Sequence, residues 1–279
     1  MSNGSGCAML QQVFSFGISI CIGMGVVGAT LRSAYADENK ESPTVSSPSQ
    51  QNNAIAALDT APVDTLELQA QEAYKQFIAK AQRQKRLLAP TDGRVQRVQA
   101  ILDKLIPYTF RWNERVRNWQ WEVQVIRRAR ADAYCLPGGK ILIDSGIFNQ
   151  LQLNDHEMAV LLAHEIAHAL RGHASDLANL RPAIPYTRED EAEADVIGND
   201  IAARAGYDPR AAISLWDRVA VIDRAKPLEY AKIHPFIGRR VEELSMRISD
   251  LLPLYAKALG KTVETLAPYK AAGKVKSRP

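Results

Sequence analysis

The segment NDHEMAVLLAHEIAHALRGHA, at residues 154–174, predicts one helix with two histidines four residues apart. Asn154 can cap this helix, and Glu157 three residues later is its capping-box partner. Residues four apart lie about 40° apart around a helix axis. His164 and His168 therefore point in the same direction and can bind one ion.

Glu165 lies beside this pair, close enough to hold a water on the metal without binding the metal itself. A zinc ion lowers the pKa of its water to about 7, and a neighbouring carboxylate can take the proton as the water attacks. The pattern therefore predicts a zinc hydrolase with Glu165 as its general base. Because short patterns also arise by chance, the motif by itself leaves a coincidental match open.

A second cluster, EAEAD at residues 191–195, lies about one helix further along the chain. Glu191 and Asp195 share one face of the predicted helix, whereas Glu193 points about 160° away from Glu191. We assign Glu191 as the third metal ligand and Asp195 as the acceptor that orients a ligating histidine. A solvated acidic face better describes Glu189, Asp190 and Glu193.

Three further histidines complete the set of five. His173 falls about 140° around the helix from His168, which predicts a solvent-facing side chain and no bond to the metal. His156 lies in the first turn of its helix, where we expect it to be exposed. His234 is followed by Pro235 and lies far from the motif in sequence.

The composition is that of a folded protein. The chain has 279 residues, of which 46% are hydrophobic and 24% charged, so we expect a packed core in one good-sized domain or two small ones. The net charge of +4 is distributed over several short Lys/Arg clusters. No nucleic-acid motif accompanies these clusters, which predicts solvated faces and no nucleic-acid partner.

Residues 1–36 have the pattern of an export signal. An uncharged apolar run at residues 13–30 is followed by Ala34-Tyr35-Ala36, so we place cleavage after Ala36 and expect a periplasmic protein. The run is also long enough to span a bilayer, which leaves an uncleaved membrane anchor as the alternative. Cleavage would leave Cys135 as the single thiol, which we expect to be buried.

The rest of the chain predicts a mostly helical α+β fold with one small central sheet. Residues 37–62 include a Ser/Pro/Gln/Asn-rich run and predict a flexible linker. The folded domain is expected at 63–256, followed by a basic tail at 257–279 that is either loose or docked on a partner. Outside the motif helix, helices are expected at 64–88, 94–106, 189–205, 209–220 and 239–252, and strands at 119–126, 131–136 and 140–144.

Five blocks of the chain resemble, in the same order, the motifs of the HtpX/Oma/BepA-like zinc metallopeptidases, peptidase family M48. They are DAYCLPGG at 132–139, HEIAHALRGH at 164–173, EAEAD at 191–195, AGYDP at 205–209, and His234-Pro235 with Arg240. The resemblance covers roughly residues 70–250. It implies a gluzincin-type domain in which one zinc ion per chain is held by His164, His168 and Glu191.

The resemblance also implies proteolytic quality control of envelope proteins. Two features depart from the family. Many members have Asn where Asp132 stands, and the chain lacks the multiple membrane spans of some members and the helical-repeat extension of others. The soluble periplasmic branch fits best. The expected partners are unfolded or misfolded proteins, with peripheral association with the membrane or the envelope assembly machinery.

Residues 131–136 predict an edge strand on which an extended substrate lies by main-chain pairing, which favours unfolded chains over folded targets. The residues expected to bind substrate are Ala131, Asp132, Ala133, Tyr134 and Cys135. His234 or Arg240 is expected to stabilise the oxyanion. For His234 a second hypothesis stays open, in which its imidazole binds the zinc of the resting enzyme as a latch.

The sequence thus predicts a zinc-dependent endopeptidase, and two other functions remain as alternatives. The first is a zinc-stabilised chaperone or binding protein that holds its clients without cutting them. Such a protein has no need of a base at Glu165. The second is a narrow-specificity oligopeptidase that acts on small peptides.

Overall fold

A three-stranded sheet lies at the centre of the computed structural model, which describes residues 63–173 and 185–273. Its strands are β1 (Glu122–Ile126), β2 (Ala133–Leu136) and β3 (Lys140–Asp144), in the order β1-β3-β2. β3 pairs in parallel with β1 and antiparallel with β2. β2 therefore lies at an edge of the sheet, as the sequence predicts.

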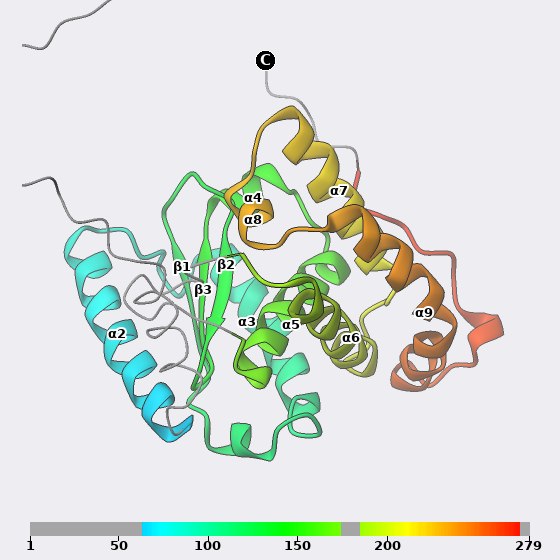
Figure 1. Ribbon diagram of the computed structural model, residues 1–279, viewed down its shortest axis with the longest axis horizontal. Helices are drawn as coiled ribbons and strands as arrows, with labels where there is room; N and C mark the ends of the chain where they lie inside the picture. Colours follow the sequence, from blue (N-terminus) through cyan, green and yellow to red (C-terminus); the bar gives the residue numbers. More distant parts are fainter. Residues whose placement is uncertain (1–62, 174–184, 274–279) are drawn as a thin grey trace, which may run out of the picture. The chain divides into compact units, whose positions relative to one another are not determined.

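Helices cover both faces of this sheet (Figure 1). They are α2 (Val63–Arg83), α3 (Gly93–Leu105) and α5 (Asp155–Arg171). α2 packs on one face, where Ala70 and Tyr74 are buried together with Tyr134. α3 and α5 pack on the other face, which carries Ala133 and Cys135, because successive strand residues point to opposite faces. The mostly helical α+β class is confirmed.

α5 is the central helix, and every residue from Glu157 to Leu170 is buried. A helix that is apolar on nearly all sides is expected to be buried on all sides. The predicted capping box is present, because Asn154 Oδ1 accepts from the Glu157 N–H and the Glu157 carboxylate accepts from the Asn154 N–H. α5 is thus held rigidly at its start and along its length.

α6 (Arg188–Arg204) lies directly against α5. Gly198 allows the close approach, because a Cβ at this position would lie 2.8 Å from the backbone nitrogen of His164. The two helices that carry the predicted ligands are therefore in backbone contact near the motif.

The remaining elements are α4 (Gly146–Gln150), α7 (Ala211–Ala225), α8 (Glu229–Ile233) and α9 (Ile237–Ala258), with 3₁₀ turns η1 (Ile106–Tyr108), η2 (Glu114–Asn118) and η3 (Val263–Thr265). α9 packs on α6 and α7. It continues past the predicted end at residue 252 and through Pro253. Tyr255 and Ala256 lie beyond the proline and are buried, and this packing offsets the hydrogen bond that a proline removes.

Residues 259–273 are bound along the domain. The Arg210 side chain donates to the Ala267 carbonyl at 2.8 Å, and Arg218 donates to the Ala272 carbonyl at 2.5 Å. The folded unit thus extends past the expected boundary at residue 256, as far as residue 273. The last residues of the predicted basic tail, 274–279, lie outside the described part of the chain.

The predicted export signal at 1–36 and linker at 37–62 also lie outside the described residues. Among the helices within the described ranges, none has both the length and the apolar character needed to cross a bilayer.

Candidate metal centre

Four buried side chains converge where α5 and α6 meet. His164 and His168 come from α5, Glu191 from the first turn of α6, and His234 from the residue that follows α8. Their ligand atoms, one from each side chain, all lie within 4.8 Å of one another. The structure thus brings the three predicted ligands together and places His234 with them.

The donor atoms suit a metal ion. Glu191 is fully buried and its Oε2 makes no hydrogen bond to a described residue, although Arg240 forms an ion pair with it. Burial would raise the pKa of Glu191, but His234 and Arg240 lower it, so the carboxylate is in the charged form that binds metals. Burial, with a further contribution from Arg240, lowers the pKa of His164 to about 4. The His164 ring is therefore neutral at physiological pH, which is the form that binds metals.

Asp195 supports one of the ligands. Its Oδ1 lies 3.1 Å from His164 Nδ1, where it can accept the ring N–H. Arg240 donates to both oxygens of Asp195 at 2.7 Å and stacks over the Trp216 ring at 3.7 Å. Burial would raise the pKa of Asp195, but Arg240 holds it at about 2. Arg240 is placed to fix the carboxylates of Asp195 and Glu191, and its predicted oxyanion role stays a prediction.

Glu165 lies beside the ligands. Its Oε1 accepts a hydrogen bond from the Tyr230 hydroxyl at 2.7 Å and lies 3.5 Å from His234 Nε2. Burial raises the pKa of Glu165 to about 7, against the lowering effects of His234 and Tyr230. A carboxyl group whose pKa is near neutrality can accept a proton and return it, which is the behaviour of a general base.

His234 occupies the junction between α8 and α9. Its Nδ1 lies 2.9 Å from Glu191 Oε1 and 3.3 Å from His164 Nε2, and its ring stacks on Tyr230 with centroids 4.2 Å apart. Burial would lower the pKa of His234, but the carboxylates of Glu165 and Glu191 raise it. This position suits metal binding and also suits donation to a reacting oxygen, so both hypotheses for His234 stay open.

His173 is not solvent-facing, contrary to the sequence prediction. α5 ends at Arg171, and Gly172 adopts a left-handed φ of 70°, so His173 leaves the helical phase on which the prediction rested. Its side chain is only 8% exposed, and its Nδ1 lies 2.8 Å from His168 Nδ1. Its Nε2 lies 3.0 Å from Glu193 Oε2. Glu193 therefore contacts a residue that packs against a ligand, whereas the sequence predicts only a place in a solvated acidic face.

His156 is half-buried, where the sequence predicts an exposed side chain. Its Nδ1 accepts the Asp208 backbone N–H at 3.0 Å. Its ring meets Tyr207, Tyr255 and Tyr269 edge-on. His156 thus belongs to the packing around the start of α5.

The predicted substrate strand corresponds to β2 and the two residues before it. All five predicted residues are buried: Ala131, Asp132, Ala133, Tyr134 and Cys135. Tyr134 packs beneath α2, on the face away from α5, and Asp132 forms an ion pair with Arg130 at 3.3 Å. Burial and the nearby Glu165 raise the pKa of the Cys135 thiol. Within the described ranges no strand pairs with the outer edge of β2, so its main chain is what it can offer to a substrate.

Sequence reasoning missed three aromatic residues that surround the ligands. Tyr186 stacks on His168 with centroids 3.7 Å apart, and Trp216 lies edge-on to His164 at 5.2 Å. Tyr230 holds Glu165, as described above. These residues come from three different segments, so no spacing rule connects them to the motif. The sequence offered one signal. Tyr230 lies four residues before His234, so the two side chains would share one face of a helix there.

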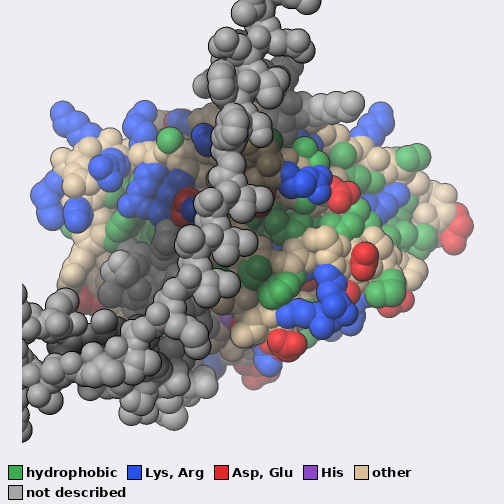
Figure 2. Space-filling model, turned by 45° about the horizontal axis from the view of Figure 1, so that its top comes forward, with side chains coloured by type: hydrophobic (Ala, Val, Ile, Leu, Met, Phe, Trp, Pro, Cys, Tyr) green, Lys and Arg blue, Asp and Glu red, His purple; other side chains and the backbone are tan. Residues whose placement is uncertain are grey.

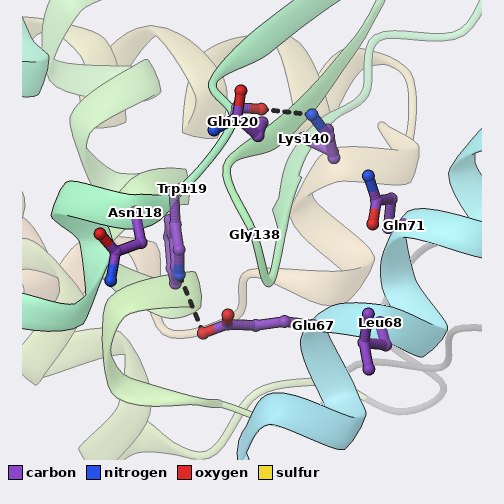
Figure 3. A pocket seen from close by; sticks show the side chains of 8 residues that line it. All are labelled: Glu67, Leu68, Gln71, Asn118, Trp119, Gln120, Gly138 and Lys140. Atoms are coloured by element: carbon purple, nitrogen blue, oxygen red, sulfur yellow. Dashed lines mark hydrogen bonds between the residues drawn. The ribbon is translucent and has the colours of Figure 1, made fainter.

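A pocket of about 270 Å³ lies away from the metal centre, between α2 and the turn that joins β2 to β3 (Figure 3). In this pocket Trp119 donates to Glu67 at 2.9 Å, and Lys140 donates to the Gln120 carbonyl. None of the predicted site residues lines it. The face drawn in Figure 2 carries Lys and Arg side chains at several separate places, with Asp and Glu side chains among them.

The chain also matches known proteins. The model of peptidase family M48 matches residues 93–184 and 175–248. The mitochondrial metalloendopeptidase OMA1 of Arabidopsis thaliana is 31% identical over 151 residues, covering 45% of this chain and 31% of that protein. OMA1 of Schizosaccharomyces pombe is 28% identical over 205 residues, covering 63% of this chain and 58% of that protein.

The beta-barrel assembly-enhancing protease of Yersinia pestis is 24% identical over 169 residues, covering 46% of this chain and 35% of that protein. The chain thus spans between about a third and three fifths of the length of these relatives. The matched region carries the convergent ligands, the carboxylate beside them and the segment of His234 and Arg240. The chain therefore belongs to peptidase family M48.

Proposed function

We propose that this protein is a zinc-dependent endopeptidase that cleaves unfolded or misassembled proteins of the cell envelope. The convergence of His164, His168 and Glu191, with Glu165 beside them, carries this proposal. The names of the relatives, metalloendopeptidases and an assembly-enhancing protease, support it. Two imidazoles and a carboxylate are a zinc donor set. When bound there, zinc acidifies a water molecule and polarises the scissile carbonyl.

Glu165 moves the proton in this mechanism. It takes a proton from the attacking water and delivers it to the leaving amine, so the O–H bond of water is exchanged for the N–H bond of the product. Tyr230 binds one oxygen of Glu165 and fixes the orientation of the carboxylate, which leaves the other oxygen for the water. Asp195, held by Arg240, keeps the His164 ring turned toward the metal.

The substrate is an extended chain that pairs with the outer edge of β2. Main-chain pairing needs a partner strand with free N–H and C=O groups, which an unfolded protein supplies and a folded one does not. In the resting protein, His234 occupies the space next to the ligands and limits access to Glu165. Under the latch hypothesis, entry of substrate displaces the His234 segment. Under the oxyanion hypothesis, His234 stays in place and donates to the reacting oxygen.

The compartment follows from the N-terminal pattern. The apolar run at 13–30 and Ala34-Tyr35-Ala36 favour export to the periplasm, with cleavage after Ala36 or retention as an anchor. One set of relatives is named for mitochondria and another for β-barrel assembly. The second name fits a protease that works on unassembled proteins, and we propose the envelope assembly machinery as its surroundings.

The test compares unfolded casein with a short peptide, with chelator and after zinc is added back. We expect internal cleavage of casein that chelator abolishes and zinc restores. Zinc-dependent suppression of aggregation without any cleavage would assign the chaperone function instead. Cleavage of the short peptide alone would assign the oligopeptidase function.

A further inference from the structure

We infer that His173 is a positioning residue for the metal ligand His168, and that Glu193 and Arg171 complete a hydrogen-bonded relay behind it. The inference rests on the metal centre of the proposed function. It concerns His173 and Glu193, for which the sequence pattern predicts solvent-facing positions.

The backbone delivers His173 to this place. Gly172 adopts a left-handed φ of 70° after the last helical residue, a conformation that favours glycine. The chain therefore folds back, and the His173 N–H donates to the His168 carbonyl at 3.0 Å. The same turn carries the imidazole of His173 beneath that of His168, where the two Nδ1 atoms lie 2.8 Å apart.

The way His168 binds the metal determines which ring nitrogen carries the proton in each histidine of this relay. His168 presents Nε2 to the cluster of ligand atoms, where it lies 3.0 Å from His164 Nε2. A neutral ring that binds metal through Nε2 carries its proton on Nδ1. That proton can be donated only if His173 Nδ1 is an acceptor, which places the proton of His173 on Nε2. His173 Nε2 faces Glu193 Oε2 at 3.0 Å, so every N–H along this relay has an acceptor.

The outer end of the relay is also fixed. Glu193 Oε1 accepts from Arg171 Nε at 2.9 Å, and Asp190 Oδ1 lies 3.5 Å from His173 Nε2. Asp190 and Glu193 are three residues apart and share one face of α6. Glu191, on another face of the same helix, belongs to the ligand cluster. α6 thus supports the metal centre at three points. Glu191 is a ligand, and Asp195 accepts from the ligand His164. Glu193 contacts His173, which lies behind the ligand His168.

The two metal-facing histidines are therefore oriented by different groups. His164 has the ionised carboxylate of Asp195 at its Nδ1, whereas His168 has the imidazole of His173. An imidazole is the weaker acceptor, and the negative charge of Glu193 strengthens it by polarising the ring. Loss of a partner of this kind typically weakens metal binding about 10- to 100-fold.

The test is the zinc dissociation constant of the full chain, measured by competition with a chromogenic chelator. His173→Leu removes the acceptor, and we expect zinc binding to weaken about 10- to 100-fold. His173→Asn keeps an oxygen close to the place of Nδ1, and we expect it to restore most of the affinity. Equal weakening in His173→Leu and His173→Asn, or none in either, would overturn the inference.

A second pair of variants avoids the buried position. Glu193→Gln removes the charge at the end of the relay and should weaken zinc binding, whereas Glu189→Gln, on an exposed residue of the same helix, should not. Equal affinity in this pair would overturn the relay even if His173→Leu fails to fold. A wild-type protein that binds no zinc would defeat the proposed function itself, whereas tight wild-type binding that all four variants share would defeat only this inference.

Discussion

Glu165 is a single carboxylate on which burial, a tyrosine hydroxyl and an imidazole all act. Glu165→Gln keeps the shape of the side chain and removes its ability to take a proton. We expect hydrolysis of unfolded casein to fall about 10²- to 10⁴-fold, because this is the usual contribution of a general base. Zinc content, measured by elemental analysis, should stay at the wild-type value because no ligand changes. Near wild-type hydrolysis by the metal-loaded variant would rule out Glu165 as the base.

His234 is the residue whose replacement separates two hypotheses. Its Nδ1 lies among the ligand atoms, so we expect His234→Ala to raise activity on unfolded protein with zinc content unchanged, as the loss of a latch would. If His234 instead donates to the oxyanion, turnover should fall about 100-fold or more. Steady-state turnover, measured together with zinc content, distinguishes these outcomes.

The residue scale also shows why part of the site could be predicted from spacing. The directions of His164 and His168 follow from helical phase, because both lie well inside α5. The same rule fails for His173, because the helix ends two residues earlier and the left-handed Gly172 redirects the chain. A glycine near the end of a periodic pattern was the available signal for that ending.

At the scale of elements, the position of the third ligand depends on how closely α6 approaches α5. A Cβ at Gly198 would lie 2.8–2.9 Å from backbone atoms of Ala163 and His164, and backbone atoms cannot rotate away. We expect Gly198→Ala to lower the free energy of unfolding by about 1–3 kcal/mol, the usual cost of overpacking. Zinc affinity should fall as well, because Glu191 moves with α6. Urea unfolding and chelator competition measure the two effects.

Gly238→Ala is the matched control. Gly238 lies in α9, and a Cβ there meets no atom within 4 Å. Alanine favours helix over glycine, so we expect a change between zero and about 1 kcal/mol of stabilisation. If Gly198→Ala behaves like Gly238→Ala in both measurements, the close helix contact does not control the site.

Element boundaries were predictable where a chemical signal marks them. The expected helix at 94–106 is observed as Gly93–Leu105, and the one at 189–205 as Arg188–Arg204, because side-chain caps at Asp92 and Thr187 fix their starts. The strand expected from residue 119 begins at Glu122 instead. Trp119 and Trp121 produced the alternating pattern there, although their rings pack against each other before the strand starts.

At the scale of the whole molecule, the contacts that escaped prediction are those between distant segments. The order of the motif blocks indicated which residues form the metal centre, because each block carries its own chemistry. Nothing in the residues after 258 indicates where they bind. The Tyr269 hydroxyl accepts from Asn154 Nδ2 at 3.1 Å, a contact between residues 115 apart. Such pairs depend on the assembled fold, which local spacing does not describe.

This C-terminal segment leads to a prediction about stability. Glu157, fully buried in the first turn of α5, accepts the Ala272 N–H at 3.1 Å and the Ser214 hydroxyl at 2.7 Å. Deleting residues 267–279 removes the Ala272 donor together with Tyr269 and the carbonyls that Arg210 and Arg218 bind. We expect the free energy of unfolding to fall by at least about 1.5–3 kcal/mol, the usual contribution of one hydrogen bond to a charged group. The thermal midpoint should fall by about 2–4 °C for each kcal/mol. The measurement uses metal-free protein, because zinc bound to the native state would mask the loss.

Deleting residues 274–279 alone keeps every one of these contacts and should leave the midpoint unchanged. Equal midpoints for the two truncations would show that the segment adds nothing to the stability of the domain.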